Sequence, residues 1–384
     1  MNTTITTDEA VLQVAASDTQ TATDEVAPAI EALSWRLMES TIAVAEMCTV
    51  YLGERLGLYR ALDRTGPADF ATVASEAGVA LRYAQEWCEQ QAVAGFVAVD
   101  DVAAPPRDRR YSLSPGHEAV LAEPESPAYL ATLGLMTAGI SSALPTLAAA
   151  FRTGEGVPYA AYGSSGREAQ ESLNRAGYIG GMADWVALLP DIQARLKQSG
   201  ARVADIGCGC GWSSVALAAS FPKAEVVGVD VDQPSIERAR EVALAQGVAG
   251  QVEFVHADAT AGLCDAVQGD FDLITVFEAL HDTARPTDVL VAIRSLLRPG
   301  GAVLIAEPAI EEQFTAPGGP MERMFLASSV LFCLPTALSS TNAEPTGAAM
   351  RPDVLRRLAT QAGFSAVSVV PVEHPMWRFY RLDA

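Results

Sequence analysis

The segment VADIGCGCGWSS, residues 203–214, reads as an apolar strand, a turn with three glycines and the start of a helix. A glycine-rich turn directly after an apolar strand usually holds a nucleotide-like ligand, because glycine lets the backbone approach the ligand closely. Dinucleotide-binding turns have the spacing G-x-G-x-x-G. Here Gly207, Gly209 and Gly211 are spaced G-x-G-x-G, and Trp212 stands where the third glycine would be. The spacing therefore argues against a pyrophosphate ligand.

An acidic residue, Asp205, stands two residues before the first of these glycines. Its carboxylate could hydrogen-bond a cationic group, which a pyrophosphate does not offer. The alternative is that Asp205 caps the following helix. Its place in a strand before the turn favours a role in ligand binding.

From residue 202 onward, apolar strands alternate with amphipathic helices. This alternation predicts a mostly parallel α/β sheet that is covered by helices on both faces. The expected strands are residues 202–207, 224–231, 252–258, 271–280, 302–308, 365–372 and 377–383.

The glycine turn resembles motif I of the class I S-adenosylmethionine-dependent methyltransferases, in which a hydrophobic strand ends in D/E-h-G-x-G-x-G. Four further segments follow in the family's order: VVGVDVD, VEFVHADA, FDLITVFEALHD and LLRPGGAVLIAEP. The resemblance covers about residues 200–384 and implies a Rossmann-like sheet whose last strand, residues 377–383, is antiparallel. It also implies S-adenosylmethionine (SAM) as the cofactor, with S-adenosyl-L-homocysteine as its product.

The resemblance further implies a set of cofactor-binding residues. Asp230 would hold the ribose hydroxyls and Asp258 would reach the adenine amino group. A solvated loop acid is the alternative at each position, and Cys208 and Cys210 could be simple space-fillers in the turn. The cofactor set is Asp205, Gly207, Cys208, Gly209, Gly211, Asp230, Val231, Asp258, Ala259 and Phe277.

His281 and Asp282 follow the expected strand at residues 271–280, at the edge of the sheet where open α/β folds bind ligands. The segment A-L-H-D resembles the L/C-H-D segment of two-domain small-molecule O-methyltransferases, in which the histidine is the general base. That family continues with Trp, whereas this chain continues with Thr283. We therefore keep two interpretations of His281, a catalytic base and a structural or substrate-lining residue. Asp282 would orient His281 or cap a helix.

Aromatic and methionine side chains are candidates for the walls of an acceptor pocket, and they suggest an apolar or aromatic acceptor. Ordinary helix packing is the alternative for each of them. Tyr178, Met182 and Trp185 share one helical face. The expected acceptor-binding residues are Tyr162, Tyr178, Met182, Trp185, Glu278 and His374, with Tyr159 as a further candidate.

Four segments are expected along the chain. Residues 1–30 are rich in threonine, alanine and acidic residues, which predicts a disordered leader. Residues 31–125 have the order of a winged helix, with two apolar helices joined near Gly53. Residues 126–198 would form a helical linker and substrate lid, and residues 199–384 the SAM-binding domain.

The winged helix could in principle bind DNA, but its charge is unsuitable. Residues 1–125 contain 20 Asp and Glu against 8 Lys and Arg, whereas a DNA-binding surface needs clustered cations. The resemblance implies instead that this domain forms a homodimer.

Composition excludes several classes of protein. The net charge of −21 over 384 residues disfavours nucleic acid and anionic membranes as partners. No apolar run approaches the roughly 20 residues that cross a bilayer, and the N-terminus lacks the features of a secretory signal. The six cysteines form no CxxC pair, and the four histidines form no i, i+4 pair. We therefore expect no metal site and a cytoplasmic location.

The sequence thus predicts a homodimeric methyltransferase that acts on a small-molecule hydroxyl, with possible general-base help from His281. Two alternatives stay open. One is a SAM-binding winged-helix regulator of transcription. The other is an enzyme of the same fold that has been diverted to chemistry other than methylation.

Overall fold

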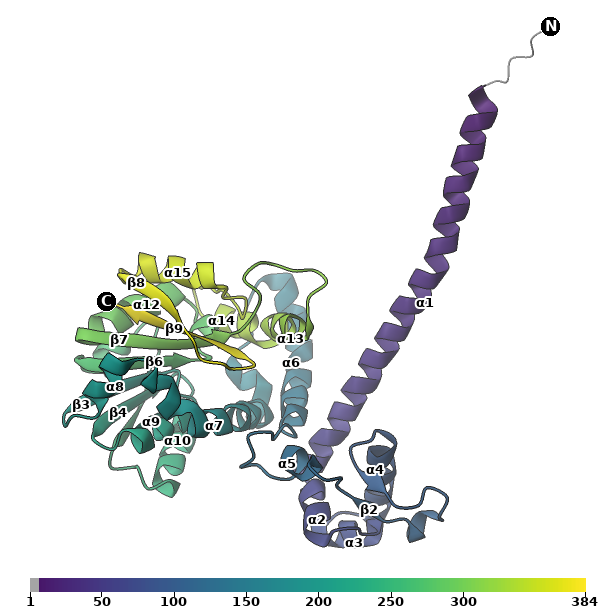
Figure 1. The fold of residues 1–384 in the computed structure, drawn as a ribbon, viewed down its shortest axis with the longest axis horizontal. Helices are drawn as coiled ribbons and strands as arrows, with labels where there is room; N and C mark the ends of the chain where they lie inside the picture. The colour runs from purple at the N-terminus through teal and green to yellow at the C-terminus, as the bar shows by residue number, and fades with distance from the viewer. Residues whose placement is uncertain (1–6) are drawn as a thin grey trace.

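The structure is a computed structural model that describes the backbone from residue 7 and side chains from residue 26. An N-terminal helical region and an α/β domain are connected by long helices (Figure 1). The N-terminal elements are α1 (Thr7–Arg55), α2 (Leu58–Thr65), α3 (Phe70–Ala77), α4 (Leu81–Val93), β1 (Ala98–Val99), η1 (Pro106–Asp108), β2 (Tyr111–Ser112) and α5 (His117–Leu121).

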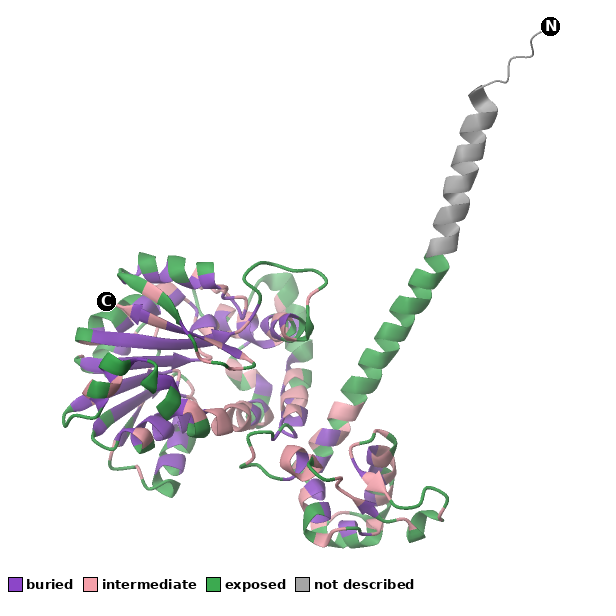
Figure 2. Ribbon diagram, in the orientation of Figure 1, coloured by how far each residue is buried: buried purple, intermediate pink, exposed green. Residues whose placement is uncertain are grey.

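Helix α1 projects away from the rest of the molecule (Figure 1). Its residues 26–45 are all exposed, as Figure 2 shows in green. The prediction of a disordered leader at residues 1–30 is wrong from residue 7 onward, because residues 7–30 belong to α1. Residues 1–6 lie outside the described part of the chain. Its alanine, glutamate and glutamine residues are good helix formers, and this local preference was underestimated.

The break between the first two helices lies at Gly57, not at Gly53. Gly57 has a φ of +69°, a left-handed conformation that glycine adopts without strain. Gly53 lies within α1, where a Cβ would come within 2.8 Å of the Trp87 ring. One glycine is thus needed for the turn and the other for close packing.

Two long helices connect the regions, and they are packed by small residues. A Cβ on Gly134 would lie 2.5 Å from the backbone nitrogen of Tyr51, and one on Gly139 would lie 2.9 Å from the Cα of Gly166. The connecting elements are α6 (Leu133–Thr153), η2 (Tyr159–Tyr162), α7 (Gly163–Ala187) and α8 (Pro190–Leu196).

Two helical stretches of the described chain are long and apolar enough to span a membrane, Leu133–Thr153 and Pro320–Leu338. About a third of the first window and somewhat more of the second are buried within the fold. Buried helices of a folded core have the same composition, and α6 packs on α1 and α7 through the glycine contacts above.

The sheet has seven strands in the order β5-β4-β3-β6-β7-β9-β8. The strands β3 to β7 are parallel to one another, whereas β9 runs antiparallel between β7 and β8. This confirms the predicted sheet and its antiparallel last strand. The strands are β3 (Ala201–Ile206), β4 (Ala224–Asp230), β5 (Val252–His256), β6 (Phe271–Phe277), β7 (Leu297–Pro308), β8 (Ala366–Val370) and β9 (Trp377–Asp383).

Helices cover both faces of the sheet, whose strands are largely buried (Figure 2). One core lies between the sheet and α7 to α10, and the other between the sheet and α11, α12 and α15. These and the remaining elements are α9 (Trp212–Ser220), α10 (Gln233–Ala245), α11 (Leu263–Ala266), η3 (Leu280–Asp282), α12 (Pro286–Leu296), α13 (Pro320–Ser328), η4 (Ser329–Cys333), α14 (Leu334–Leu338) and α15 (Pro352–Gln361).

Candidate functional site

The glycine turn connects β3 to α9, and its three glycines have different surroundings. All three have positive φ, between +52° and +82°. A Cβ on Gly207 would lie 2.4 Å from the Cβ of Ala279, and one on Gly211 would lie 2.8 Å from the Phe254 ring. Nothing lies within 4 Å of the position that a Cβ on Gly209 would take. Gly207 and Gly211 therefore have no room for a side chain, whereas Gly209 borders open space.

A cavity of about 400 Å³ lies at the carboxyl ends of β3, β4, β5 and β6, beside helix α7. It is the edge of the sheet at which open α/β folds bind ligands. The expected residues that line the cavity are Gly207, Cys208, Gly209, Asp230, Val231, Asp258, Ala259, Phe277, Tyr178, Glu278 and Asp282, together with Tyr159.

Other expected site residues do not line this cavity: Asp205, Gly211, Tyr162, Met182, Trp185, His281 and His374. Met182 and Trp185 belong to the core between α7 and the sheet. The Tyr162 hydroxyl donates to the carbonyl oxygen of Leu331 at 2.7 Å. His374 stacks on Trp377 with the ring centres 4.3 Å apart. In this structure these four side chains make contacts within the fold and do not reach the cavity.

Asp230 fixes the turn from the end of β4. Its Oδ2 accepts a hydrogen bond from the backbone N–H of Gly209, and its Oδ1 accepts one from that of Asp232, both at 2.8 Å. Burial raises the pKa of the Asp230 carboxyl, while these two N–H donors oppose the rise. The carboxylate and Gly209 are thus held together at the cavity wall.

The predicted ligand contact of Asp205 is corrected by its position behind the turn. Its Oδ2 accepts from the hydroxyls of Ser213 and Ser214 at 2.6 Å, and its Oδ1 accepts from Thr275 Oγ1 at 2.8 Å. Only 1% of its surface is exposed. Burial raises the pKa of this carboxyl and the three hydroxyls lower it. Asp205 is therefore a positioning residue that ties α9 to the strands β3 and β6.

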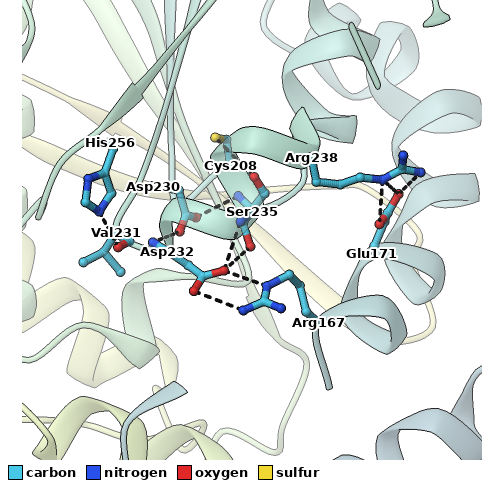
Figure 3. A network of polar contacts seen from close by, with 10 residues as sticks. Arg167, Glu171, Cys208, Asp230, Val231, Asp232, Ser235, Arg238 and His256 are labelled. Carbon is cyan, nitrogen blue, oxygen red and sulfur yellow. Dashed lines mark hydrogen bonds and ion pairs between the residues drawn. The ribbon is translucent and has the colours of Figure 1, made fainter. Parts of the chain in front are cut away.

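Asp258 lies after β5, at the same edge of the sheet, and also lines the cavity. The Asp258 carboxylate accepts from the backbone N–H of Thr260 at 2.7 Å, and the side chain is exposed. The carbonyl oxygen of Val231 lies 2.9 Å from Nε2 of His256 (Figure 3). The Asp258 carboxylate is thus accessible to a ligand.

Helix α7 contributes a charged face that the sequence analysis missed. Arg167 forms an ion pair with Asp232 at 2.7 Å, and Asp232 in turn accepts from Ser235 at the start of α10 (Figure 3). One turn later, Glu171 pairs with Arg238 at 3.0 Å. The sequence signal for this face was the spacing of Arg167, Glu171 and Tyr178, which places the three side chains on the same side of a helix.

Carboxyl groups outnumber cations in the cavity. Among the described residues that line it, a single arginine faces six acidic side chains: Glu171, Asp230, Asp232, Asp258, Glu278 and Asp282. Such a cavity favours a positively charged ligand. The open space at Gly209 and this charge balance together fit a cationic nucleoside such as SAM.

His281 lies in η3, beneath the cavity. Its Nδ1 lies 2.6 Å from Glu307 Oε2, and its Nε2 lies 3.3 Å from Asp282 Oδ1. Burial lowers the pKa of His281, but the negative charges of Asp282 and Glu307 raise it. The net effect is a pKa well above the usual value of 6.5. The two carboxylates thus favour the protonated form of the ring, and the short contact with Glu307 fixes its orientation.

One cluster of side chains has the donor atoms that a metal site would need, although the sequence predicts no metal site. Among the described residues, donor atoms of His281, Asp282 and Cys333 lie within 4.8 Å of one another. Both ring nitrogens of His281 already face carboxylates, an arrangement that a protonated ring satisfies without an ion. We assign no ion to this cluster. All six cysteines are unpaired.

Comparison with known sequences gives a match for the segment that contributes most of the cavity's lining. Residues 197–331 match the model of a family described as "Methyltransferase domain". A ubiquinone biosynthesis O-methyltransferase of Xanthomonas axonopodis pv. citri (strain 306) is 35% identical over 115 residues, which are 30% of this chain and 46% of that protein. The chain thus spans about half the length of this curated relative.

Solved structures extend the likeness to the whole fold. Human N-acetylserotonin methyltransferase in complex with SAM has a TM-score of 0.64 at 17% identity, with 91% of this chain and 97% of that chain covered. An O-methyltransferase family protein from Burkholderia thailandensis has a TM-score of 0.65 at 16% identity, with 90% and 96% covered. The predicted resemblance is confirmed: residues 197–331 match the model of a methyltransferase domain, and the chain shares the fold of these solved methyltransferases.

Proposed function

We propose that this protein transfers the methyl group of SAM to a hydroxyl of an apolar or aromatic small molecule. The main support is the open space at Gly209 beside Asp230, in a cavity whose carboxyl groups favour a cation. When bound, SAM supplies a methyl group on a positively charged sulfur that is already activated for transfer. Tyr178 and Phe277 line the same cavity with rings 5.8 Å apart and offer an aromatic wall for the acceptor.

The chain's own residues would orient the two reactants. Gly207, Gly209 and Asp230 would hold the nucleoside, and Asp258 would contact its base. The charged face of α7 would cover the cavity and exclude water, which strengthens electrostatic interactions inside it. A regulator of transcription is disfavoured by the acidic N-terminal region.

A matched pair of glycine variants tests the proposal. Gly209 and Gly247 both have positive φ and nothing within 4 Å of the position that a Cβ would take, but only Gly209 lines the cavity. We expect Gly209→Ala to weaken SAM binding in calorimetry by roughly tenfold or more, and Gly247→Ala to leave it unchanged. The proposal is overturned if the wild type binds neither SAM nor S-adenosyl-L-homocysteine, and the same holds if it binds a pyridine dinucleotide instead.

We further propose that the protein is a homodimer through its N-terminal region. Val26, Ile30, Leu33, Leu37 and Val44 of α1 are exposed and follow the 4-3-4-7 spacing of a coiled-coil seam. A second copy offers the same seam, so that the contact is self-complementary in a twofold dimer. The six unpaired cysteines are compatible with the cytoplasm, where we place the protein.

A further inference from the structure

Glu278 occupies an unusual backbone position at the edge of the cavity. It directly follows β6 and has a φ of +53°, which is rare for a residue with a side chain. Its backbone N–H donates to the carbonyl oxygen of Ala306 at 2.9 Å, so that β7 holds this conformation in place. Strained residues of this kind cluster at functional sites, where the surrounding structure maintains them.

The Glu278 side chain is half-buried, and its carboxyl group is incompletely paired. It lines the cavity, and its Oε1 has no hydrogen-bond partner among the described residues. Trp377 Nε1, on β9, faces the Glu278 carboxyl group but forms no hydrogen bond of good geometry. A buried polar atom without a partner is costly in free energy, and a ligand in the cavity can remove that cost.

The charged and titratable groups around Glu278 come from four elements. His281 and Asp282 lie on η3, Glu307 lies on β7, Tyr178 lies on α7 and Trp377 lies on β9. Burial raises the pKa of Glu278 to about 8; the positive charge of His281 opposes the rise, and Glu307 and Asp282 add to it. The carboxyl thus changes charge close to neutral pH, where a general base is most effective.

His281 lacks these properties. It does not line the cavity, and both of its ring nitrogens face carboxylates. We propose that Glu278, and not His281, is the catalytic base that takes the proton of the acceptor hydroxyl, and that the acceptor is a phenol. This inference rests on the proposed methyl transfer. His281 is then a positioning residue whose positive charge favours the ionised form of Glu278.

The proposed step balances without a further reactant. The ionised carboxylate of Glu278 takes the hydroxyl proton while the phenol oxygen forms a bond to the methyl carbon of SAM. The carbon–sulfur bond breaks, and its electron pair stays on sulfur, which becomes a neutral thioether. The proton then leaves Glu278 for water, and the carboxylate is restored.

Two phenols of different acidity test the base directly, with labelled SAM as the methyl donor. A nitrophenol is already partly ionised near neutral pH, whereas 1-naphthol is not. We expect Glu278→Gln to lower kcat on 1-naphthol by about a hundredfold and kcat on the nitrophenol far less. A purely structural role would lower both equally, and that result would overturn the inference.

The pH profile separates the two residues. In the wild type, kcat/KM for SAM should rise with pH and level off above about pH 8, following the pKa of Glu278 in the free enzyme. Glu278→Gln should remove this rise, whereas His281→Gln should keep it and shift it to higher pH, because a favourable positive charge is lost. If instead His281→Gln removes the rise and Glu278→Gln keeps it, His281 is the base and the inference is wrong.

A binding measurement decides the matter even if neither phenol is a substrate. At pH 7 the free Glu278 carboxyl is mostly protonated, and a nearby sulfonium should ionise it. Calorimetry in two buffers of different ionisation enthalpy should then detect proton release on SAM binding, and less on binding of S-adenosyl-L-homocysteine. Release that persists in Glu278→Gln contradicts the inference, while Glu312→Gln, an exposed carboxyl, serves as the control. Absence of SAM binding in the wild type would refute the proposed function itself.

Discussion

The Nδ1 atom of His281 lies 2.6 Å from Oε2 of Glu307, and Glu307 has no exposed surface. The pair joins η3 to β7, next to Asp282, which lines the cavity. A buried ion pair adds little stability relative to apolar residues, but the loss of one partner leaves the other charge uncompensated.

Replacement of one partner of this pair should destabilise the fold strongly. We expect Glu307→Gln to lower the free energy of unfolding by about 3 kcal/mol, because the His281 imidazolium loses its buried counter-charge. Urea denaturation followed by circular dichroism measures this change. Glu312→Gln, at an exposed position, should change stability by less than about 0.5 kcal/mol. Equal stability of the two variants would mean that His281 is neutral in the folded protein.

The same pair predicts a pH dependence of stability. The folded pKa of His281 is raised well above 6.5, since Asp282 and Glu307 outweigh the effect of burial. The stability that it contributes is therefore fully present below about pH 6.5 and is lost as the pH rises through the folded pKa. The difference in unfolding free energy between the wild type and His281→Gln should thus decrease at alkaline pH. A difference that grows with pH would contradict the assignment.

Asp205 should act through the position of α9. We expect Asp205→Ala to lower the free energy of unfolding by about 3 kcal/mol, because three hydroxyls lose a buried acceptor. Asp205→Asn keeps the shape and one acceptor oxygen, so that its cost should be smaller. Chemical denaturation together with SAM calorimetry distinguishes the two roles. If SAM affinity falls while stability is unchanged, Asp205 contacts the ligand after all.

The ion pair between Arg167 and Asp232 should control how tightly α7 closes over the cavity. Both side chains are largely buried, with 18% and 13% of their surface exposed. We expect Arg167→Gln to raise the dissociation rate of S-adenosyl-L-homocysteine by about fivefold, as the loss of roughly 1 kcal/mol implies. Stopped-flow fluorescence of Trp212, which lines the cavity, follows this rate. Arg64→Gln removes an exposed pair with Glu76 and should have no effect.

The coiled-coil seam on α1 predicts the effect of a single charge on assembly. Leu37→Glu places a carboxylate on the seam and should convert the dimer to a monomer in analytical ultracentrifugation. Ala32→Glu adds the same charge on α1 away from the seam, and the dimer should persist. Dissociation by both variants alike would show that the contact does not follow the seam.

The sequence was sufficient for the sheet because each strand carries its own pattern. The alternation of strands and helices and the spacing of Gly207, Gly209 and Gly211 are local features, and both led to the correct fold. Contacts between distant segments were not accessible in this way. Nothing near Asp205 indicates that Thr275, 70 residues later, donates to it, and nothing near His281 indicates that Glu307 occupies its Nδ1.

The same distinction explains the errors at the site. Tyr178 and Trp185 lie on the same face of α7, so that the sequence does not distinguish them. Only Tyr178 lines the cavity. The rotation of α7 against the sheet decides which of the two side chains is covered. Glu278 could be named but its function could not, since its burial and its positive φ arise from the fold. The hydrophobic pattern of the sequence predicts which helices and strands form, whereas tertiary packing decides which residues each side chain contacts.

The position of β9 between β7 and β8 has a consequence for synthesis on the ribosome. Residues 377–383 are translated after the other six strands of this sheet, yet they complete the hydrogen bonding of β7. Until they emerge, β7 presents an unpaired edge, and such edges invite pairing with other nascent chains. The open edge of β7 is therefore exposed to such pairing until β9 is available.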